Sequence, residues 1–179
     1  MSQGNIDRVY DELLVTLVRE GDLRAGERLA ARWQPRLLRT ARRLLNDPEQ
    51  AKDAVQEAWV GICRGWMSLD DPAKFPAWAF SILHRKCADR IRIAQKRRAH
   101  EIDVAADMPI KNGVESAVSV SQAFSQLSPD MRAAAVLYFS EGLTLAEIAI
   151  ATDVPVGTAK SRIFHARQRL KAILDGESS

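Results

Sequence analysis

The sequence has few cysteines and no long hydrophobic run, and each absence excludes a class of protein. Two cysteines, Cys63 and Cys87, are too few for a disulfide framework, and no cysteine and histidine spacing resembles a zinc site. We expect both thiols to be small apolar fillers of a core. No apolar run approaches the roughly 18 residues that cross a bilayer, and the first residues lack the pattern of a signal peptide. We therefore expect a cytoplasmic protein with no direct membrane insertion.

Signals for strands and for catalysis are also scarce. No long alternation of β-branched and polar residues occurs, which predicts an all-α fold. The three histidines, His84, His100 and His165, stand in no recognisable catalytic order with a serine, cysteine or carboxylate, and no glycine-rich loop could cradle a phosphate. We therefore predict no catalytic site, no metal site and no cofactor. His84 and His165 are expected to lie on exposed basic faces.

Charge is unevenly distributed along the chain. The formal net charge is only +3, but cations gather in residues 85–98 and again in residues 160–171, with a mostly acidic stretch between them. The local sign of charge matters more for partner choice than the total. Hydrophobic residues make up 46% of the chain, which is enough to build a core. The composition therefore indicates a folded protein with two basic regions.

The helix start and stop signals along the chain predict two small helical domains joined by a flexible linker. Residues 1–23 are an N-terminal extension, residues 24–97 form the first domain, and residues 120–175 form the second. Between them, residues 98–119 contain Pro109, Asn112 and Gly113 and show no sustained apolar face. A flexible coil of about 20 residues averages roughly 25 Å from end to end, so this linker could separate the two domains widely.

Two short helices with a tight turn between them are predicted from Thr144 onward. Thr144 and Glu147 have the spacing of a capping box, which starts one helix, and Pro155 opens the next. A periodic apolar set marks the buried face of this second helix: Val156, Ala159, Ile163, Ala166, Leu170 and Ile173. Helix, turn and helix in this order predict a helix-turn-helix.

The opposite face of the second helix is basic and rich in hydrogen-bonding groups. Side chains of this kind reach base edges in the major groove, and a small glycine permits close approach to a phosphate. The residues that we predict to contact DNA are Gly157, Thr158, Lys160, Ser161, Arg162, His165 and Arg167. The alternative is a surface hairpin whose cations are merely solvated.

Two segments together resemble the extracytoplasmic-function (ECF) group of bacterial sigma factors. ARRLLNDPEQAKDAVQEAW, residues 41–59, is similar to the family's second region, and LSPDMRAAAVLYFSEGLTLAEIAIATDVPVGTAKSRIFHARQRL, residues 127–170, is similar to its fourth region. The likeness extends over about residues 25–174. It implies a sigma factor that binds core RNA polymerase, through its largest and β-flap-bearing subunits, and promoter DNA. It also implies −35 recognition by the helix-turn-helix and control by an anti-sigma factor.

The resemblance also implies roles for residues of the first domain. Asp53, Gln56 and Glu57, which are neighbours on a helix surface, correspond to a contact with the polymerase largest subunit. Residues 75–98 resemble the segment that melts the promoter and reads the −10 element, and their cations suit a phosphate backbone. The implied −10 contacts are Arg85, Lys86, Asp89, Arg90, Arg92, Lys96 and Arg97.

Three details of residues 68–85 add to what the resemblance implies. Family members often carry asparagine where this chain has Arg85, so the resemblance does not carry the family's −10 specificity over to this position. The loop of residues 68–74 is the family's candidate for capturing unpaired bases. Trp78 falls at a core-facing step, so we expect it to pack in the core rather than to stack on a base.

Two other functions compete with a sigma factor. One is an interaction protein that mimics a sigma factor and sequesters an anti-sigma factor. The other is a free-standing helix-turn-helix repressor, which would usually dimerise on two half-sites. No dimerisation element is evident in the sequence, and the first domain would have no role in a repressor. The sigma factor is therefore the leading hypothesis.

Overall fold

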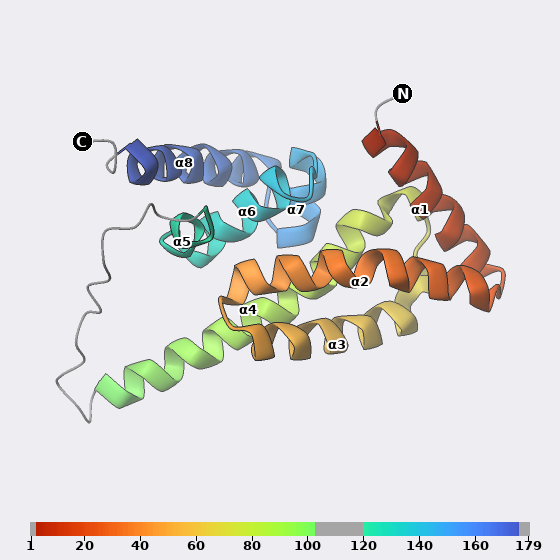
Figure 1. Cartoon of the computed structure of the whole chain (residues 1–179), viewed down its shortest axis with the longest axis horizontal. Coiled ribbons are helices and arrows are strands. Elements are labelled where there is room, and N and C mark those ends of the chain that lie inside the picture. The colour runs from red at the N-terminus through yellow and green to blue at the C-terminus, as the bar shows by residue number, and fades with distance from the viewer. Residues whose placement is uncertain (1–2, 103–119, 176–179) are drawn as a thin grey trace.

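The computed structural model describes residues 3–102 and 120–175, and within these residues the chain is helical with no strand. Figure 1 shows the helices in two groups, one lying on the other. The helices are α1 (Gln3–Arg19), α2 (Leu23–Leu45), α3 (Pro48–Gly65), α4 (Phe75–Ile102), α5 (Val120–Ser125), α6 (Pro129–Phe139), α7 (Leu145–Thr152) and α8 (Val156–Asp175), with two 3-10 turns, η1 (Trp66–Ser68) and η2 (Pro72–Lys74), between α3 and α4. The all-α fold predicted from the sequence is confirmed.

Aspartate side chains begin the two central helices of the first group. Asp22 accepts hydrogen bonds from the first backbone N–H groups of α2 at 2.8 and 3.1 Å, and Asp47 does the same for α3 at 3.0 and 3.1 Å. Such caps satisfy donors that have no partner within the helix. Asn46 ends α2 with a left-handed backbone, φ 54°, so the chain reverses tightly into α3.

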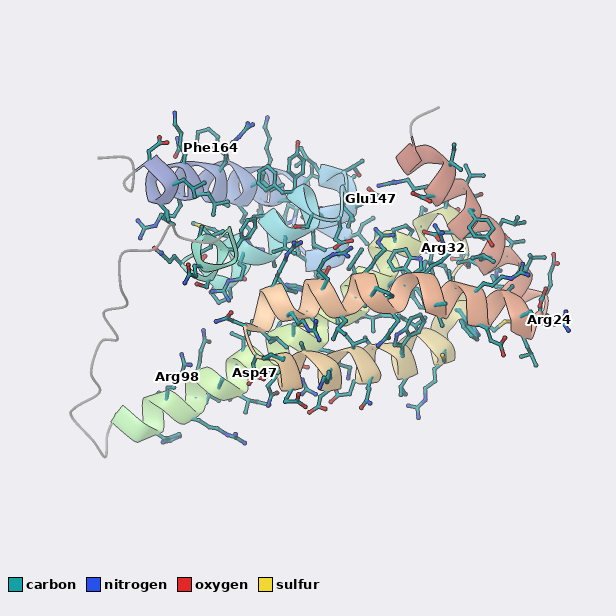
Figure 2. The ribbon with its side chains drawn as sticks, in the orientation of Figure 1. Arg24, Arg32, Asp47, Arg98, Glu147 and Phe164 are labelled. Carbon is teal, nitrogen blue, oxygen red and sulfur yellow. The ribbon has the colours of Figure 1, made fainter. Side chains whose placement is uncertain are left out.

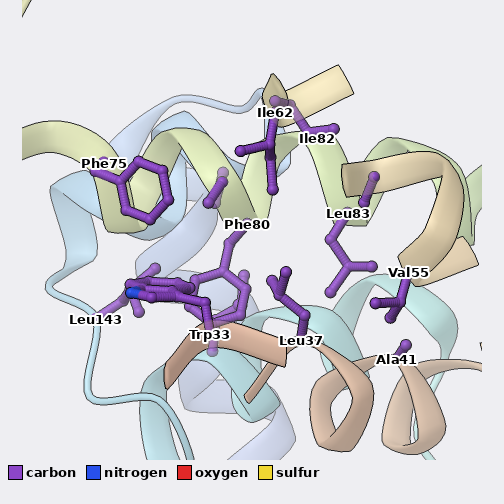
Figure 3. Packing of buried hydrophobic residues seen from close by; sticks show 14 of the residues in the cluster. Trp33, Leu37, Ala41, Val55, Ile62, Phe75, Phe80, Ile82, Leu83 and Leu143 are labelled. Carbon is purple, nitrogen blue, oxygen red and sulfur yellow. The ribbon is translucent and has the colours of Figure 1, made fainter. Parts of the chain in front are cut away.

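Aromatic side chains fill the core of the first group (Figure 3). Trp33 is fully buried on α2, and its ring meets the edge of Phe75 at a centroid distance of 4.9 Å and tilts against Phe80 at 5.4 Å. Leu37, Ile62 and other aliphatic residues of α2, α3 and α4 surround these rings. Edge-on contacts of this kind stabilise a core beyond the area they bury.

The predicted N-terminal extension forms helix α1, which belongs to this first group. Leu14, Val15 and Val18 are buried in the same core, and the largely buried carboxylate of Asp11 accepts a hydrogen bond from Arg32 Nε at 2.9 Å. That contact raises the pKa of the Arg32 guanidinium above its ordinary value, against the opposing effect of burial. Gln3–Arg19 therefore form a helix that packs on the first group rather than a separate extension.

The second group contains the predicted helix-turn-helix. Both halves of the capping box are present, because Glu147 accepts from the Thr144 N–H at 2.7 Å and the Thr144 hydroxyl accepts from the Glu147 N–H at 3.3 Å. Asp153, with φ 53°, makes the turn into α8. Ala159, Ile163 and Ala166 are buried as predicted. Val156 is 49% exposed, so its predicted place on the buried face is wrong.

The two groups pack against each other and share one core. Helix α7 lies along α4, and α6 lies on α2 (Figure 1). Leu143, Ile148 and Val136 of the second group are buried in the same cluster as Trp33 and Phe80 of the first. The two helical groups are thus in direct contact, an arrangement that is called closed below. The sequence, in contrast, predicts domains that could separate widely.

The predicted linker starts too early in the sequence. Residues 98–102 continue α4, because no proline or glycine interrupts its last turns. The rest of the predicted linker, residues 103–119, lies outside the described residues.

Candidate DNA and polymerase interfaces

One face of α8 is turned away from the rest of the protein. Lys160, Ser161, Phe164 and His165 are exposed together on it, at the spacing of neighbours on a helix surface. Figure 2 shows Phe164 pointing outward from the helix. The Phe164 ring is 55% exposed and meets the His165 imidazole edge-on at a centroid distance of 5.5 Å. This face combines one cation, two hydrogen-bonding groups and an aromatic ring.

The structure divides the residues predicted to read DNA into two sets. Gly157, Lys160, Ser161, His165 and Arg167 are exposed. A methyl group added at Gly157 would meet no atom within 4 Å, so this position is open to an approaching partner. The Ser161 hydroxyl donates to the carbonyl of Thr158 within the helix at 2.9 Å, but it keeps its lone pairs for an external donor.

Thr158 and Arg162 are half-buried at the edge of this face. Arg162 Nη2 donates to Asp130 Oδ2 at 2.5 Å, which ties α8 to the first turn of α6. The sequence places Arg162 on the exposed face because it lies four residues after Thr158 and one after Ser161. The acid that holds it lies 32 residues away, which no local pattern indicates.

Phe164 was missed in the sequence reasoning. A search for base-reading residues favours cations and polar groups, and Phe164 is neither. A usable signal was nevertheless present, because Phe164 lies three residues after Ser161 and four after Lys160 and so must share their face. An exposed aromatic ring in the middle of a basic face is an apolar contact surface that requires an explanation.

The predicted −10 helix, α4, is paired with α3 along one side. Glu57 on α3 accepts from Arg90 Nη2 at 2.7 Å and lies 3.4 Å from Lys86 Nζ. Both cations are half-buried. The carboxylate that the family resemblance assigns to polymerase therefore pairs with two cations assigned to DNA, and the three groups together keep one positive charge.

The other predicted −10 residues remain on the outer side of α4. Arg85, Arg92, Lys96 and Arg97 are exposed, and Asp89, also exposed, pairs with Arg92 at 2.6 Å. Arg85 reaches back to the carbonyl of Ser81 at 3.4 Å. This side of the helix presents a row of cations to solvent, as tracking a phosphate backbone requires.

The residues predicted to contact polymerase lie on one face of α3. Asp53, Gln56 and Glu57 are all exposed there. The side chains of Asp53 and Gln56 make no hydrogen bond to the described residues, whereas the Glu57 carboxylate contacts the two cations of α4. Asp53 and Gln56 are thus the members of this set that are open to a partner.

His84 does not lie on an exposed face as predicted. It is half-buried in a hollow between α4 and α6 that Cys87 and Asp130 also line. Burial lowers the pKa of the His84 imidazole, and the nearby Arg162 and Arg85 lower it further, against the opposing effect of Asp130. The prediction for His165 is confirmed, since this residue is exposed.

The prediction that Trp78 packs in the core is supported by its contacts. Its ring lies 6.0 Å from that of Phe75, and its edge approaches α3 so closely that a methyl group at Gly65 would come within 2.8 Å of it.

The loop of residues 68–74, which the family resemblance proposes for unpaired bases, contains the 3-10 turn η2. Asp71 caps this turn, and Leu69 of the same loop is buried.

Metal-binding clusters and membrane-spanning helices are both absent from residues 3–102 and 120–175. No group of three or more His, Cys, Asp or Glu side chains there could hold a metal ion. Over the same residues, no helix has the length and apolarity needed to cross a membrane.

Comparison with known proteins agrees with the two halves of this architecture. Residues 29–97 match the family described as Sigma-70 region 2, and residues 117–170 match Sigma-70, region 4. The ECF RNA polymerase sigma factor SigM of Mycobacterium tuberculosis is 34% identical over 175 residues, covering 96% of this chain and 87% of that protein. The RNA polymerase sigma-H factor of Pseudomonas aeruginosa is 31% identical, covering 92% and 93%.

A solved structure supports the same assignment. The sigma factor RpoE from Bartonella quintana, in complex with the anti-sigma factor NepR, superposes with a TM-score of 0.69 at 25% sequence identity, over 84% of this chain and 96% of that one. Two sigma regions in this order, relatives of matching length and a common fold agree with one another. The chain therefore belongs to the ECF group of the sigma-70 family.

Proposed function

We propose that this protein is an alternative sigma factor that binds core RNA polymerase and directs promoter-specific transcription initiation at −10 and −35 elements. The observation that carries the proposal is the combination of an outward basic face on α8 with a cation-lined α4 in one chain of this family. Such a protein needs no active site or cofactor of its own, because polymerase supplies the chemistry. Its place of action is the cytoplasm, where polymerase works.

At the −35 element, α8 enters the major groove. Lys160 and Arg167 contact phosphates, Gly157 allows the backbone to approach closely, and Ser161 and His165 reach base edges. Phe164 adds an apolar surface for the methyl group of thymine, the one apolar feature of the major-groove edge. Thr158 and Arg162 act from the edge of the face, where Asp130 holds the guanidinium of Arg162 in position.

At the −10 element, α4 tracks the DNA backbone with Arg85, Arg92, Lys96 and Arg97. Lys86 and Arg90 lie next to Glu57 and contribute less free charge. Asp89, which pairs with Arg92, orients that guanidinium rather than binding DNA itself. Arg85 in place of the family's usual asparagine favours phosphate contact over base reading at this position.

Core polymerase binds α3 through Asp53 and Gln56, which are exposed, with Glu57 at the edge of the contact. The largest subunit takes this face, and the β-flap-bearing subunit takes the C-terminal domain. An anti-sigma factor controls the protein, and the structural similarity to a sigma factor solved with an anti-sigma factor supports this.

The competing function, sequestration of an anti-sigma factor without promoter recognition, is less favoured. A mimic would need the surfaces that an anti-sigma factor binds but would have no use for an outward-facing Lys160, Ser161, Phe164 and His165. That these side chains are exposed and available for DNA favours the sigma factor.

Two matched double variants test the proposed roles with core polymerase and promoter DNA. Asp53→Ala with Gln56→Ala is expected to weaken core binding. Lys160→Ala with His165→Ala is expected to leave core binding intact and to abolish initiation at promoters that depend on the −35 element. Glu27→Ala, an exposed change on α2, serves as the control. If the wild-type chain binds an anti-sigma factor but supports no initiation, the mimic is correct.

A further inference from the structure

Glu141, in the turn between α6 and α7, is a carboxylate buried between the two domains. Its side chain is only 1% exposed. Thr40 Oγ1 donates to its Oε1 at 2.9 Å and Arg36 Nε donates to its Oε2 at 3.2 Å, both from the middle of α2. Arg39 Nη2 lies 3.8 Å from Oε1. The second domain thus places a charged carboxylate against Arg36, Arg39 and Thr40 of α2. These three residues together are called the seat of Glu141.

The seat on α2 is held in shape by residues of the first helical group, including α1. The Arg36 guanidinium lies over the Trp33 ring at 4.2 Å and 5.7 Å from the centre of the Phe80 ring. Asp11 of α1 lies 3.7 Å from Arg36 on another side. A guanidinium fixed by aromatic rings and a second carboxylate loses little freedom when it binds Glu141. The seat is therefore preorganised for one carboxylate.

Two further contacts join the domains on either side of Glu141. Arg132 Nη1 donates to the carbonyl of Leu44, at the end of α2, at 3.1 Å. Arg8 of α1 donates to Glu147 at 2.8 Å and to the carbonyl of Gly142 at 3.2 Å. Leu143 is buried close to Trp33 in the shared core (Figure 3). Arg8 lies before residue 29, where the match to region 2 begins.

The closed arrangement is too small to bind both promoter elements. The −10 and −35 positions are about 25 base pairs apart, which is about 85 Å of DNA at ~3.4 Å per base pair. A compact chain of 179 residues has a radius of gyration of about 16 Å and is roughly 40 Å across. The two DNA-binding helices must therefore move apart before both elements are engaged.

We propose that Glu141 and its seat on α2, reinforced by Arg8 of α1, form an intramolecular latch that holds the free protein closed and limits promoter binding. This inference rests on the proposed function for its biological meaning. The apparent affinity of a protein is reduced by the fraction of molecules in the binding-competent state. Opening the latch therefore raises promoter affinity without changing any DNA-contacting residue.

Energy transfer between two dyes measures the latch in the full-length free chain. One dye is attached to exposed Cys63 on α3 and the other to a cysteine introduced by Gln168→Cys on α8, while buried Cys87 stays unlabelled. Glu141→Gln keeps the shape of the side chain but removes its charge, and it is expected to raise the open fraction about tenfold or more. Arg8→Ala removes a more exposed pair and is expected to raise it about two- to fivefold.

The control is Glu27→Gln, the same chemical change at an exposed site of α2. The proposal predicts lower transfer efficiency for both latch variants than for the control, and a fall in wild-type efficiency when polymerase and promoter are added. In unlabelled chains, promoter complexes should form at correspondingly lower protein concentration.

Two results would overturn the latch. One is an unchanged efficiency in both Arg8→Ala and folded Glu141→Gln, and the other is a wild-type efficiency that stays constant on promoter binding. If Glu141→Gln does not fold, Arg8→Ala decides alone. Failure of the proposed function gives a different result. The wild-type protein would then not bind polymerase at all, whereas energy transfer in the free chain would still report on the latch.

Discussion

At the scale of single residues, the two cysteines have opposite environments. Cys87 is buried on α4, and burial raises the pKa of its thiol to about 12. Cys63 is exposed on α3, so the expectation that it fills a core is wrong. Because the thiolate is the reactive form, only one of the two is chemically accessible in the folded protein.

We predict that the folded protein has one rapidly reacting thiol. A chromogenic disulfide reagent should titrate Cys63 at once and Cys87 only after denaturation, and Cys63→Ser should abolish the fast phase. Two fast thiols in protein whose fold is intact would contradict the burial of Cys87.

His84 is predicted to make folding stability depend on pH. Its pKa is lowered in the folded state, mainly by burial, with Arg162 and Arg85 facing it and Asp130 opposing them. The unfolded chain therefore binds a proton below its ordinary pKa of about 6.5 while the folded chain does not. The contribution of His84 is complete above that pH and is lost as the pH falls below it.

Urea midpoints of wild type and His84→Gln check this sign. The wild type should lose more stability than the variant between pH 7.5 and pH 5.5, because other groups titrate equally in both. An equal loss in the two proteins would show that His84 stays exposed and ordinary.

At the scale of elements, Arg132 joins three helices. Its guanidinium donates to the carbonyls of Phe124 (3.0 Å), Ser125 (2.6 Å) and Leu127 (3.1 Å) at the end of α5, and to Leu44 (3.1 Å) at the end of α2. These carbonyls lie at or just beyond helix C-termini, where backbone acceptors lack the usual intrahelical donors and where a cation is favoured. Burial lowers the pKa of the Arg132 guanidinium, but the group stays charged.

We predict that Arg132→Lys destabilises the protein by about 2–3 kcal/mol, since an ammonium cannot reach carbonyls on two helices and leaves some of them unpaired. The free energy of unfolding in urea measures the effect. Arg42→Lys, at an exposed position of α2, provides the control and should change little. An equal change in the free energy of unfolding for the two variants would mean that a lysine at position 132 replaces the guanidinium of Arg132.

Helix α8 is expected to read its DNA with separable contacts. Lys160→Ala should weaken binding uniformly across sequences and reduce the slope of log affinity against log salt by about 1. Phe164→Ala should leave the slope unchanged and lose the preference for thymine.

Deoxyuridine, which lacks the C5 methyl group, tests this role of Phe164. Replacing the contacted thymine of the −35 element by deoxyuridine should weaken wild-type binding about fourfold, from burial of roughly one methyl group worth ~0.8 kcal/mol. The same replacement should not affect Phe164→Ala. Equal sensitivity in both proteins would remove Phe164 from base readout.

These elements also show what a sequence can reveal. The Thr144 and Glu147 capping box was predictable because its partners are three residues apart, and Ala159, Ile163 and Ala166 were predictable from helical periodicity. Arg162 was predicted on the exposed face because its acidic partner lies 32 positions away, and no local pattern reveals the pair of Lys86 with Glu57 across 29 positions. Local signals specify helices, whereas long-range pairs decide which charges stay available.

At the scale of the whole molecule, the closed packing of the two domains was not predictable. Glu141 is an ordinary acid in a turn, and Thr40 an ordinary polar residue on a helix, until the fold brings them within 2.9 Å. The sequence suggested only that the domains could separate. The structure adds that they start together, with α1 as a third participant through Arg8.

The central claim is that this chain gives RNA polymerase its promoter specificity. The most direct test is to sequence the 5′ ends of transcripts made on genomic DNA by core polymerase reconstituted with the protein. The account predicts discrete start sites that share −10 and −35 sequences and that disappear with the Lys160→Ala, His165→Ala variant. Start sites no different from those of core polymerase alone would contradict it.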